Sequence, residues 1–230
     1  MHPPRHAGHG TPPLQAGTLT LGGGGTHTGA VTVASGSTLH FGGGTHTLSA
    51  TSSISGAGTV NFSNGTVNLA GTYNITGSTT VTGGVANWTG TLTSLGPTLT
   101  VSIGTANLSS GEAISLSTLT LTSGTLRGTD AITVSGATSW TSGVMTGAGT
   151  TSMQGGLTMS GGGAKALGGG RLLALSGTSS WTGTGPLASD ASGLGTFRLV
   201  SGTFTVGDAG AQSISNNGGT LALEIQAGTT

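Results

Sequence analysis

The feature that most constrains this sequence is a pattern that returns about every 20 residues, a spacing within the range that solenoid repeats use. Leu19, Leu39 and Val60 stand at equivalent points of three successive repeats. The string Gly-Gly-Thr-His-Thr at 24–28 recurs one repeat later, at 43–47. A repeat of this length, built from short extended segments, is typical of a solenoid in which each coil packs on the next.

Within each repeat, small polar and apolar residues alternate strictly. A period of two is the signature of a β-strand with one buried face, and Thr, Val, Ile and Leu all suit such strands. The runs predicted as strands are 18–21, 30–33, 38–41, 59–62, 66–69, 98–101, 118–121, 131–134, 203–206 and 220–223.

Composition explains how so simple a pattern can fold. The 230 residues include 48 Gly, and Gly, Thr and Ser together exceed half of the chain, while charged residues make up 4%. Gly permits the sharp corners between strands, and Thr and Ser tolerate an outward position on a pleated surface. Like charges would stack about 4.8 Å apart in adjacent coils, so a solenoid benefits from having few of them.

These observations predict an all-β fold, a right-handed parallel β-helix of roughly ten coils of 19–22 residues, about 50 Å long. The solenoid is expected over residues 16–230, after a Pro- and His-rich N-terminal extension at 1–15. A stack of antiparallel hairpins is the alternative, but the two-residue turns that hairpins favour are scarce, with Asn64-Gly65 the clearest.

The same composition excludes several functional classes. Five scattered Lys and Arg residues cannot neutralise a nucleic-acid backbone, so no nucleic-acid partner is expected. The chain has no Cys for a disulfide framework. Nowhere does it contain the long apolar run of a membrane span, and residues 1–15 lack the features of a secretory signal.

Three strings resemble bacterial cell-surface β-helix proteins, namely filamentous-haemagglutinin-like and autotransporter-passenger-like adhesins. They are Ser-Gly-Thr-Leu-Arg-Gly at 123–128, the Trp-containing stretch at 135–151, and Gly-Gly-Thr-Leu-Ala-Leu-Glu-Ile at 218–225. The resemblance covers about residues 16–230 and implies a β-helical fold and an extracellular or cell-surface location. The chain departs from such proteins in showing no signal peptide and no translocator barrel. Its ending, residues 219–230, resembles a mid-protein stretch of these families, so we expect the chain to be one piece of a longer protein.

Few residues could carry catalysis. Glu112, Arg127 and Asp130 lie about one coil apart and could meet on one face, where paired carboxylates would suit glycoside cleavage. The simpler interpretation makes them isolated surface or turn charges. We therefore expect no enzyme, no catalytic residue and no cofactor, and keep a polysaccharide-cleaving β-helix as an alternative.

The histidines suggest a ladder. His27 and His46 occupy equivalent positions of adjacent coils and should stack, with His40 nearby on the opposite strand face. Stacked imidazoles can bind a transition metal, but two of them without a carboxylate make a weak site. The sequence therefore predicts a structural ladder and no metal.

Trp88, Trp140 and Trp181 each precede a Thr. Exposed aromatic rings at such positions could stack on sugar rings, which makes these three possible carbohydrate contacts. Packing of the indoles inside the solenoid is the interpretation that the pattern favours.

Outward Thr-x-Thr pairs suggest a third kind of surface. Such pairs occur at 18/20, 98/100 and 118/120, and stacked rows of them are typical of ice-binding solenoids. Asn, Ser, Ala and His interrupt the rows here, so ice binding ranks below the other hypotheses.

Five possible N-glycosylation sequons fall between residues 61 and 109, at Asn61, Asn64, Asn74, Asn87 and Asn107. Some of these Asn residues could instead belong to a turn or an Asn ladder. Sugars attached here would supply hydrophilicity that charges do not.

The leading functional hypothesis is a non-catalytic extracellular structural or adhesive β-solenoid. It would be a subunit or segment of a surface filament or stalk, assembled by end-to-end stacking. Its expected partners are copies of itself, head-to-tail or lateral, and cell-surface or matrix glycans. A carbohydrate-binding or polysaccharide-cleaving β-helix is the alternative, and an ice-binding solenoid is the third hypothesis.

Overall fold

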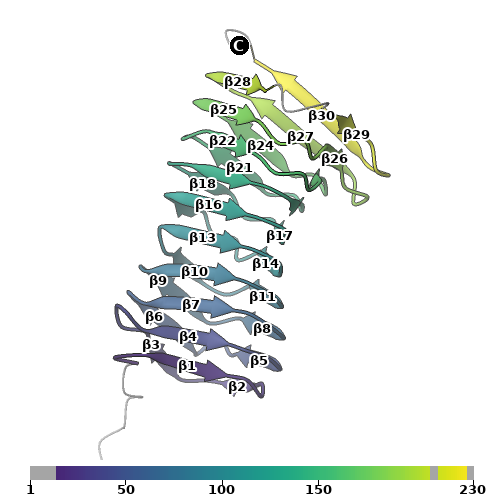
Figure 1. Ribbon diagram of the computed structural model, residues 1–230. Helices are drawn as coiled ribbons and strands as arrows, with labels where there is room; N and C mark the ends of the chain where they lie inside the picture. The colour runs from purple at the N-terminus through teal and green to yellow at the C-terminus, as the bar shows by residue number, and fades with distance from the viewer. Residues whose placement is uncertain (1–13, 208–211, 227–230) are drawn as a thin grey trace, which may run out of the picture.

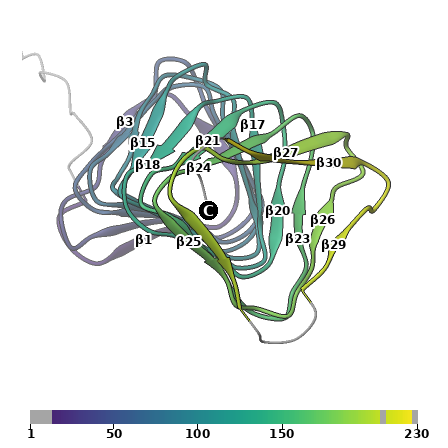
Figure 2. The same cartoon turned by 90° about the horizontal axis from the view of Figure 1, so that it is seen from above.

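The computed structural model describes residues 14–207 and 212–226, and this part of the chain is all-β. The chain winds into a stack of about nine turns, each contributing one strand to each of three faces (Figure 1). Seen from the C-terminal end, it runs counterclockwise from β25 through β26 to β27 while rising toward the viewer (Figure 2). The helix is therefore right-handed, and the predicted parallel β-helix is confirmed.

The first face is a ten-stranded sheet, and all its ladders are parallel. Its strands are β1 (Thr18–Leu21), β4 (Thr38–Phe41), β7 (Thr59–Phe62), β10 (Ser78–Val81), β13 (Thr98–Val101), β16 (Thr118–Leu121), β19 (Thr138–Trp140), β22 (Leu157–Met159), β25 (Thr178–Trp181) and β28 (Thr203–Val206).

The second face is also a ten-stranded parallel sheet. Its strands are β2 (Gly25–His27), β5 (Thr45–Leu48), β8 (Thr66–Leu69), β11 (Val85–Trp88), β14 (Thr105–Leu108), β17 (Thr125–Gly128), β20 (Gly143–Met145), β23 (Lys165–Leu167), β26 (Leu187–Ser189) and β29 (Ile214–Ser215).

The third face is divided into sheets of four and six strands. The first holds β3 (Ala30–Thr32), β6 (Ser53–Gly56), β9 (Thr72–Ile75) and β12 (Leu92–Leu95). The second holds β15 (Ile114–Leu116), β18 (Ile132–Val134), β21 (Thr150–Met153), β24 (Leu172–Leu175), β27 (Leu194–Leu199) and β30 (Thr220–Ile225). The ladder breaks between β12 and β15, where a longer connection at 109–113 precedes β15.

Coil length is the one respect in which the predicted geometry is wrong. On the first face, the number of residues between paired positions of successive strands stays within the predicted 19–22 as far as β25. The last such interval, from Thr178 to Thr203, is longer. The step from Leu187 to Ile214 on the second face is longer still. The connections between strands lengthen here, and Figure 2 shows the last coils extending beyond the outline of the first ones.

The core is a continuous column of inward side chains. On the first face Leu39, Val60 and Leu99 are at most 1% exposed, whereas the Thr residues that flank them face outward. Aromatic rings interlock between coils: Phe41 and Phe62 stack with ring centroids 5.2 Å apart, and Phe62 meets Trp88 edge-on at 5.2 Å. A modest apolar fraction therefore suffices, because each inward side chain is buried by the coils above and below.

Corners between strands depend on Gly because coils approach closely there. Gly65 has a φ of 73°, and a Cβ atom at this position would lie 2.0 Å from the carbonyl oxygen of Gly44 in the previous coil. Both the backbone conformation and the inter-coil spacing therefore exclude a side chain at this corner.

Candidate functional site

Hydroxyl groups form two columns along the outer surface of the first face. The ladder register places the Thr-x-Thr pairs predicted at 18/20, 98/100 and 118/120 on equivalent rungs of the sheet. The column through Thr100 carries a polar side chain on all ten strands: Thr20, His40, Asn61, Thr80, Thr100, Thr120, Ser139, Thr158, Ser180 and Thr205. This outer surface contains no Lys, Arg, Asp or Glu on any strand of the face.

The second face carries an Asn ladder on its outer surface. The Asn87 amide donates to Asn68 at 2.9 Å, and the Asn107 amide donates to Asn87 at 3.1 Å. Ser109 extends the chain by donating to Asn107 at 3.0 Å. The amide nitrogens of Asn87 and Asn107, to which a glycan would be attached, are thus already used in the ladder.

The other sequons lie in different surroundings. Asn64 is exposed and its side chain accepts a hydrogen bond from the Gly65 amide, as expected of a turn. Asn61 accepts from Thr82 at 3.0 Å and is half-buried, as is Asn74 on the third face. Among the five sequons, Asn64 offers the most accessible attachment point.

The three tryptophans lie in the core. Trp88 is 1% exposed, Trp140 0% and Trp181 4%, so none of the indole rings presents a face to solvent. They cannot serve as the carbohydrate contacts considered above without leaving the interior. The indole N–H groups of all three find no hydrogen-bond partner.

Two histidines form the ladder expected at the N-terminal end. The His27 and His46 rings stack with centroids 5.2 Å apart, and His27 Nε2 lies 2.9 Å from His46 Nδ1. His46 Nε2 donates to the Gly43 carbonyl, so Nδ1 of neutral His46 accepts a hydrogen bond from the Nε2–H group of His27. Burial, followed by the charge of His46, lowers the pKa of His27 below its ordinary value of 6.5.

Acidification should therefore weaken the first two coils. In the unfolded chain His27 takes up a proton near pH 6.5, whereas the folded protein takes it up only at a lower pH. Below pH 6.5 the unfolded state therefore binds more protons than the folded state, and the free energy of unfolding falls. We expect a lower melting temperature at pH 5 than at pH 7.5, with part of the difference absent in His27→Gln. His40→Gln is the control: His40 faces outward, bonded to Ser63 and Thr20, and should retain the full difference.

The three charges expected on one face, Glu112, Arg127 and Asp130, differ in their surroundings. Asp130 is 3% exposed, and its carboxylate accepts hydrogen bonds from the backbone and hydroxyl of Ser110 and from the backbone of Gly111. It thereby holds the long connection before β15. Glu112 and Arg127 are exposed on the surface.

A buried arginine, which the sequence analysis did not identify, crosslinks this corner. Arg171 is 0% exposed and donates to the carbonyl of Thr146 at 2.7 Å, to the hydroxyl of Thr151 at 2.9 Å and to the carbonyl of Gly128 at 2.8 Å. Burial lowers the pKa of Arg171 to about 10, against the opposing effect of Asp130, so the guanidinium is charged at neutral pH. Its position after three Gly residues resembles an exposed turn, so the sequence carries no local signal of its burial.

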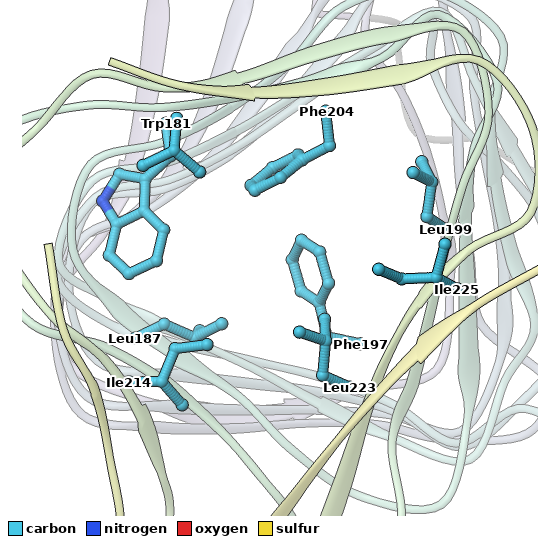
Figure 3. Close-up of a pocket in the computed structure, with 9 residues that line it drawn as sticks. Trp181, Leu187, Phe197, Leu199, Phe204, Ile214, Leu223 and Ile225 are labelled. Atoms are coloured by element: carbon cyan, nitrogen blue, oxygen red, sulfur yellow. The ribbon is translucent and has the colours of Figure 1, made fainter. Parts of the chain in front are cut away.

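The C-terminal end of the core is open. Side chains from the last two coils surround an apolar hollow of about 320 Å³ (Figure 3). Val206 is 50% exposed, Ile214 53%, Leu223 55% and Ile225 66%, although the strand pattern directs such residues inward. Trp181, Leu187 and Phe197 line the inner part of the hollow.

Within residues 14–207 and 212–226, no group of three or more His, Asp or Glu side chains is placed to hold a metal ion. The same residues form no helix long and apolar enough to cross a membrane. No protein-family model, curated protein or solved structure matches the chain. The fold and its surface define a right-handed parallel β-solenoid with a hydroxyl-rich exterior.

Proposed function

We propose that this chain is a non-catalytic, extracellular structural or adhesive β-solenoid, a subunit or segment of a surface filament or stalk that assembles by end-to-end stacking. The open apolar end of the core carries this proposal. Among the described strands, β28, β29 and β30 are the last of their ladders and lie at the same end of the stack, where a further strand could add to each sheet. A further coil placed there would bury the apolar hollow and complete the ladders together.

The distribution of charge supports a structural role. The described carboxylates act separately: Asp130 holds a loop, Glu224 pairs with Arg198, and Asp190 accepts hydrogen bonds from Ser192 and Thr146. These contacts give each of the three carboxylates a partner within the fold, which supports a structural role. The long outer faces offer hydroxyl and amide groups, which suit contact with a hydrated surface.

Replacing one apolar side chain at the open end should abolish self-association. In Ile225→Lys, stacking would bury an unpaired ammonium group, a cost that apolar contact cannot offset. We expect the wild-type chain to associate with rising concentration in sedimentation velocity, and Ile225→Lys to remain monomeric. Ile103→Lys is the matched control, because Ile103 is 73% exposed in the connection between β13 and β14, two strands in the middle of their sheets.

Discrete dimers or longer polymers would both support end-to-end contact. A wild-type chain that stays monomeric at high concentration contradicts the stacking proposal. Equal loss of association in Ile103→Lys would place the contact elsewhere.

Ice binding is the second candidate, and the two outer columns of the first face favour it. Positions in these columns repeat about every 4.8 Å across the strands and about 6.7 Å along them, and hydroxyls occupy most of them, with His40 and Asn61 interrupting one column. Thermal hysteresis should be measurable and should fall by more than half in Thr100→Lys, at the centre of the face. Thr105→Lys on the second face is the control, and absence of hysteresis in the wild type eliminates this candidate.

A further inference from the structure

A shallow polar groove of about 390 Å³ runs along the corner that follows the second face. It begins beside the end of β14 and ends at the turn after β26. Four inter-coil steps separate these points, or about 19 Å, so the groove can accommodate an extended chain. The side chains along it are Asn107, Ser109, Arg127, Thr129, Thr146 and Ser192.

The floor of the groove is backbone. Gly128, Gly147 and Gly169 follow one another in successive coils. A Cβ atom on Gly147 would lie 2.5 Å from the carbonyl oxygen of Gly128, and one on Gly169 would lie 2.5 Å from the nitrogen of Gly147. The close approach of the coils thus excludes side chains from the floor and keeps the groove open.

Positive charge lies at the groove and directly beneath it. Arg127 is exposed, and in the described part of the chain no carboxylate forms an ion pair with it, whereas the half-buried Arg198 pairs with Glu224. The buried guanidinium of Arg171 binds the carbonyls of Gly128 and Thr146, both of which line the groove. Arg171 thereby fixes the shape of the floor.

A negative charge, the carboxylate of Asp190, lies next to residues at the far end of the groove. Burial alone would raise the pKa of the Asp190 carboxyl group, but hydrogen bonds from Ser192 and Thr146 outweigh burial and lower this pKa. Asp190 is therefore ionised at neutral pH. Asp130 lies below the other end and is already occupied by Ser110 and Gly111.

We propose that this groove binds an acidic saccharide, with Arg127 holding a carboxylate or sulfate of the sugar chain. A guanidinium matches either group with two parallel hydrogen bonds. Asn107, Ser109 and Thr129 offer hydrogen bonds to sugar hydroxyls, and Ser192 and Thr146, which Asp190 holds, offer more at the far end. The negative charge of Asp190 disfavours an evenly charged polyanion. An acidic saccharide carries its charges farther apart and can keep them away from Asp190.

The test is binding of defined oligosaccharides measured by isothermal titration calorimetry. Oligogalacturonate and sulfated dextran oligomers should bind, whereas neutral dextran and polyphosphate should bind at least tenfold more weakly. Arg127→Gln should weaken the tighter of the two acidic ligands at least tenfold. Arg198→Gln is the control for the loss of an Arg charge and should bind as the wild type does.

Either of two results would overturn the proposal: no acidic saccharide binds, or Arg127→Gln binds as tightly as the wild type. Polyphosphate binding as tight as that of the saccharides would also overturn it, in favour of general anion attraction. The inference deepens the proposed adhesive role, so the titrations are repeated with Ile225→Lys. If Ile225→Lys stays monomeric but still binds the saccharide, binding does not depend on stacking. Each proposal can then fail without the other failing.

Discussion

Replacing Arg171 by Met should destabilise the protein by about 3–5 kcal/mol, the cost typical of removing one member of a buried charged network. The substitution leaves the carbonyls of Gly128 and Thr146 and the hydroxyl of Thr151 without their donor inside the corner. It also removes a cation that interacts electrostatically with Asp130. Urea unfolding followed by circular dichroism measures the change.

Two further variants separate charge from geometry at this corner. Arg171→Lys keeps the charge but cannot direct donors to three acceptors at once, so it should also be destabilised, although less than Arg171→Met. Arg127→Met removes an equal charge from an exposed position and should change stability by no more than about 0.5 kcal/mol. An Arg171→Met protein as stable as the wild type would show that the crosslink contributes nothing.

The strands could be predicted because their signal is local. At 18–21, 38–41 and 59–62 the alternation of Thr with apolar residues coincides with β1, β4 and β7. The rings of His27 and His46 stack as the repeat of their sequence strings predicts, although the ladder pairs His46 with Gly25 and His27 with Leu48, a register that the repeat does not predict. A period of two and a period of about 20 are sufficient to place such residues without knowledge of the rest of the chain.

The corners could not be predicted in this way. Arg171 binds partners 20, 25 and 43 residues away, and no local pattern indicates such contacts. Lys165 is likewise fully buried, with its ammonium donating to the Gly163 carbonyl, and burial lowers its pKa. The polar groove arises where Gly residues of successive coils meet, so it depends on three-dimensional register.

Arg171 and Lys165 lie in coils that keep to the predicted length. Arg171 occupies a corner of its coil with a long side chain that satisfies backbone carbonyls. The longer last steps, from Thr178 to Thr203 and from Leu187 to Ile214, surround the apolar hollow instead. The interior polar crosslink and the hollow therefore arise in different parts of the stack.

Replacing Trp140 by Ala should cost about 3–5 kcal/mol, the range typical for truncating a buried aromatic side chain. Trp140 is 0% exposed and lies in register between Leu121 and Met159, so truncation would leave a cavity through the centre of the column. Trp140→Phe should cost less than half as much, because it retains most of the ring and removes an indole N–H that has no partner.

Urea unfolding of the two variants, together with the saccharide titrations, decides between packing and sugar contact at Trp140. A packing residue loses stability in Trp140→Ala, while Trp140→Phe keeps both stability and binding. A sugar-contacting ring would show the reverse, a large loss of binding with little loss of stability, since an exposed side chain contributes little to the core. We expect the first result, because the alternation in β19 places Ser139 outward and turns both Thr138 and Trp140 inward.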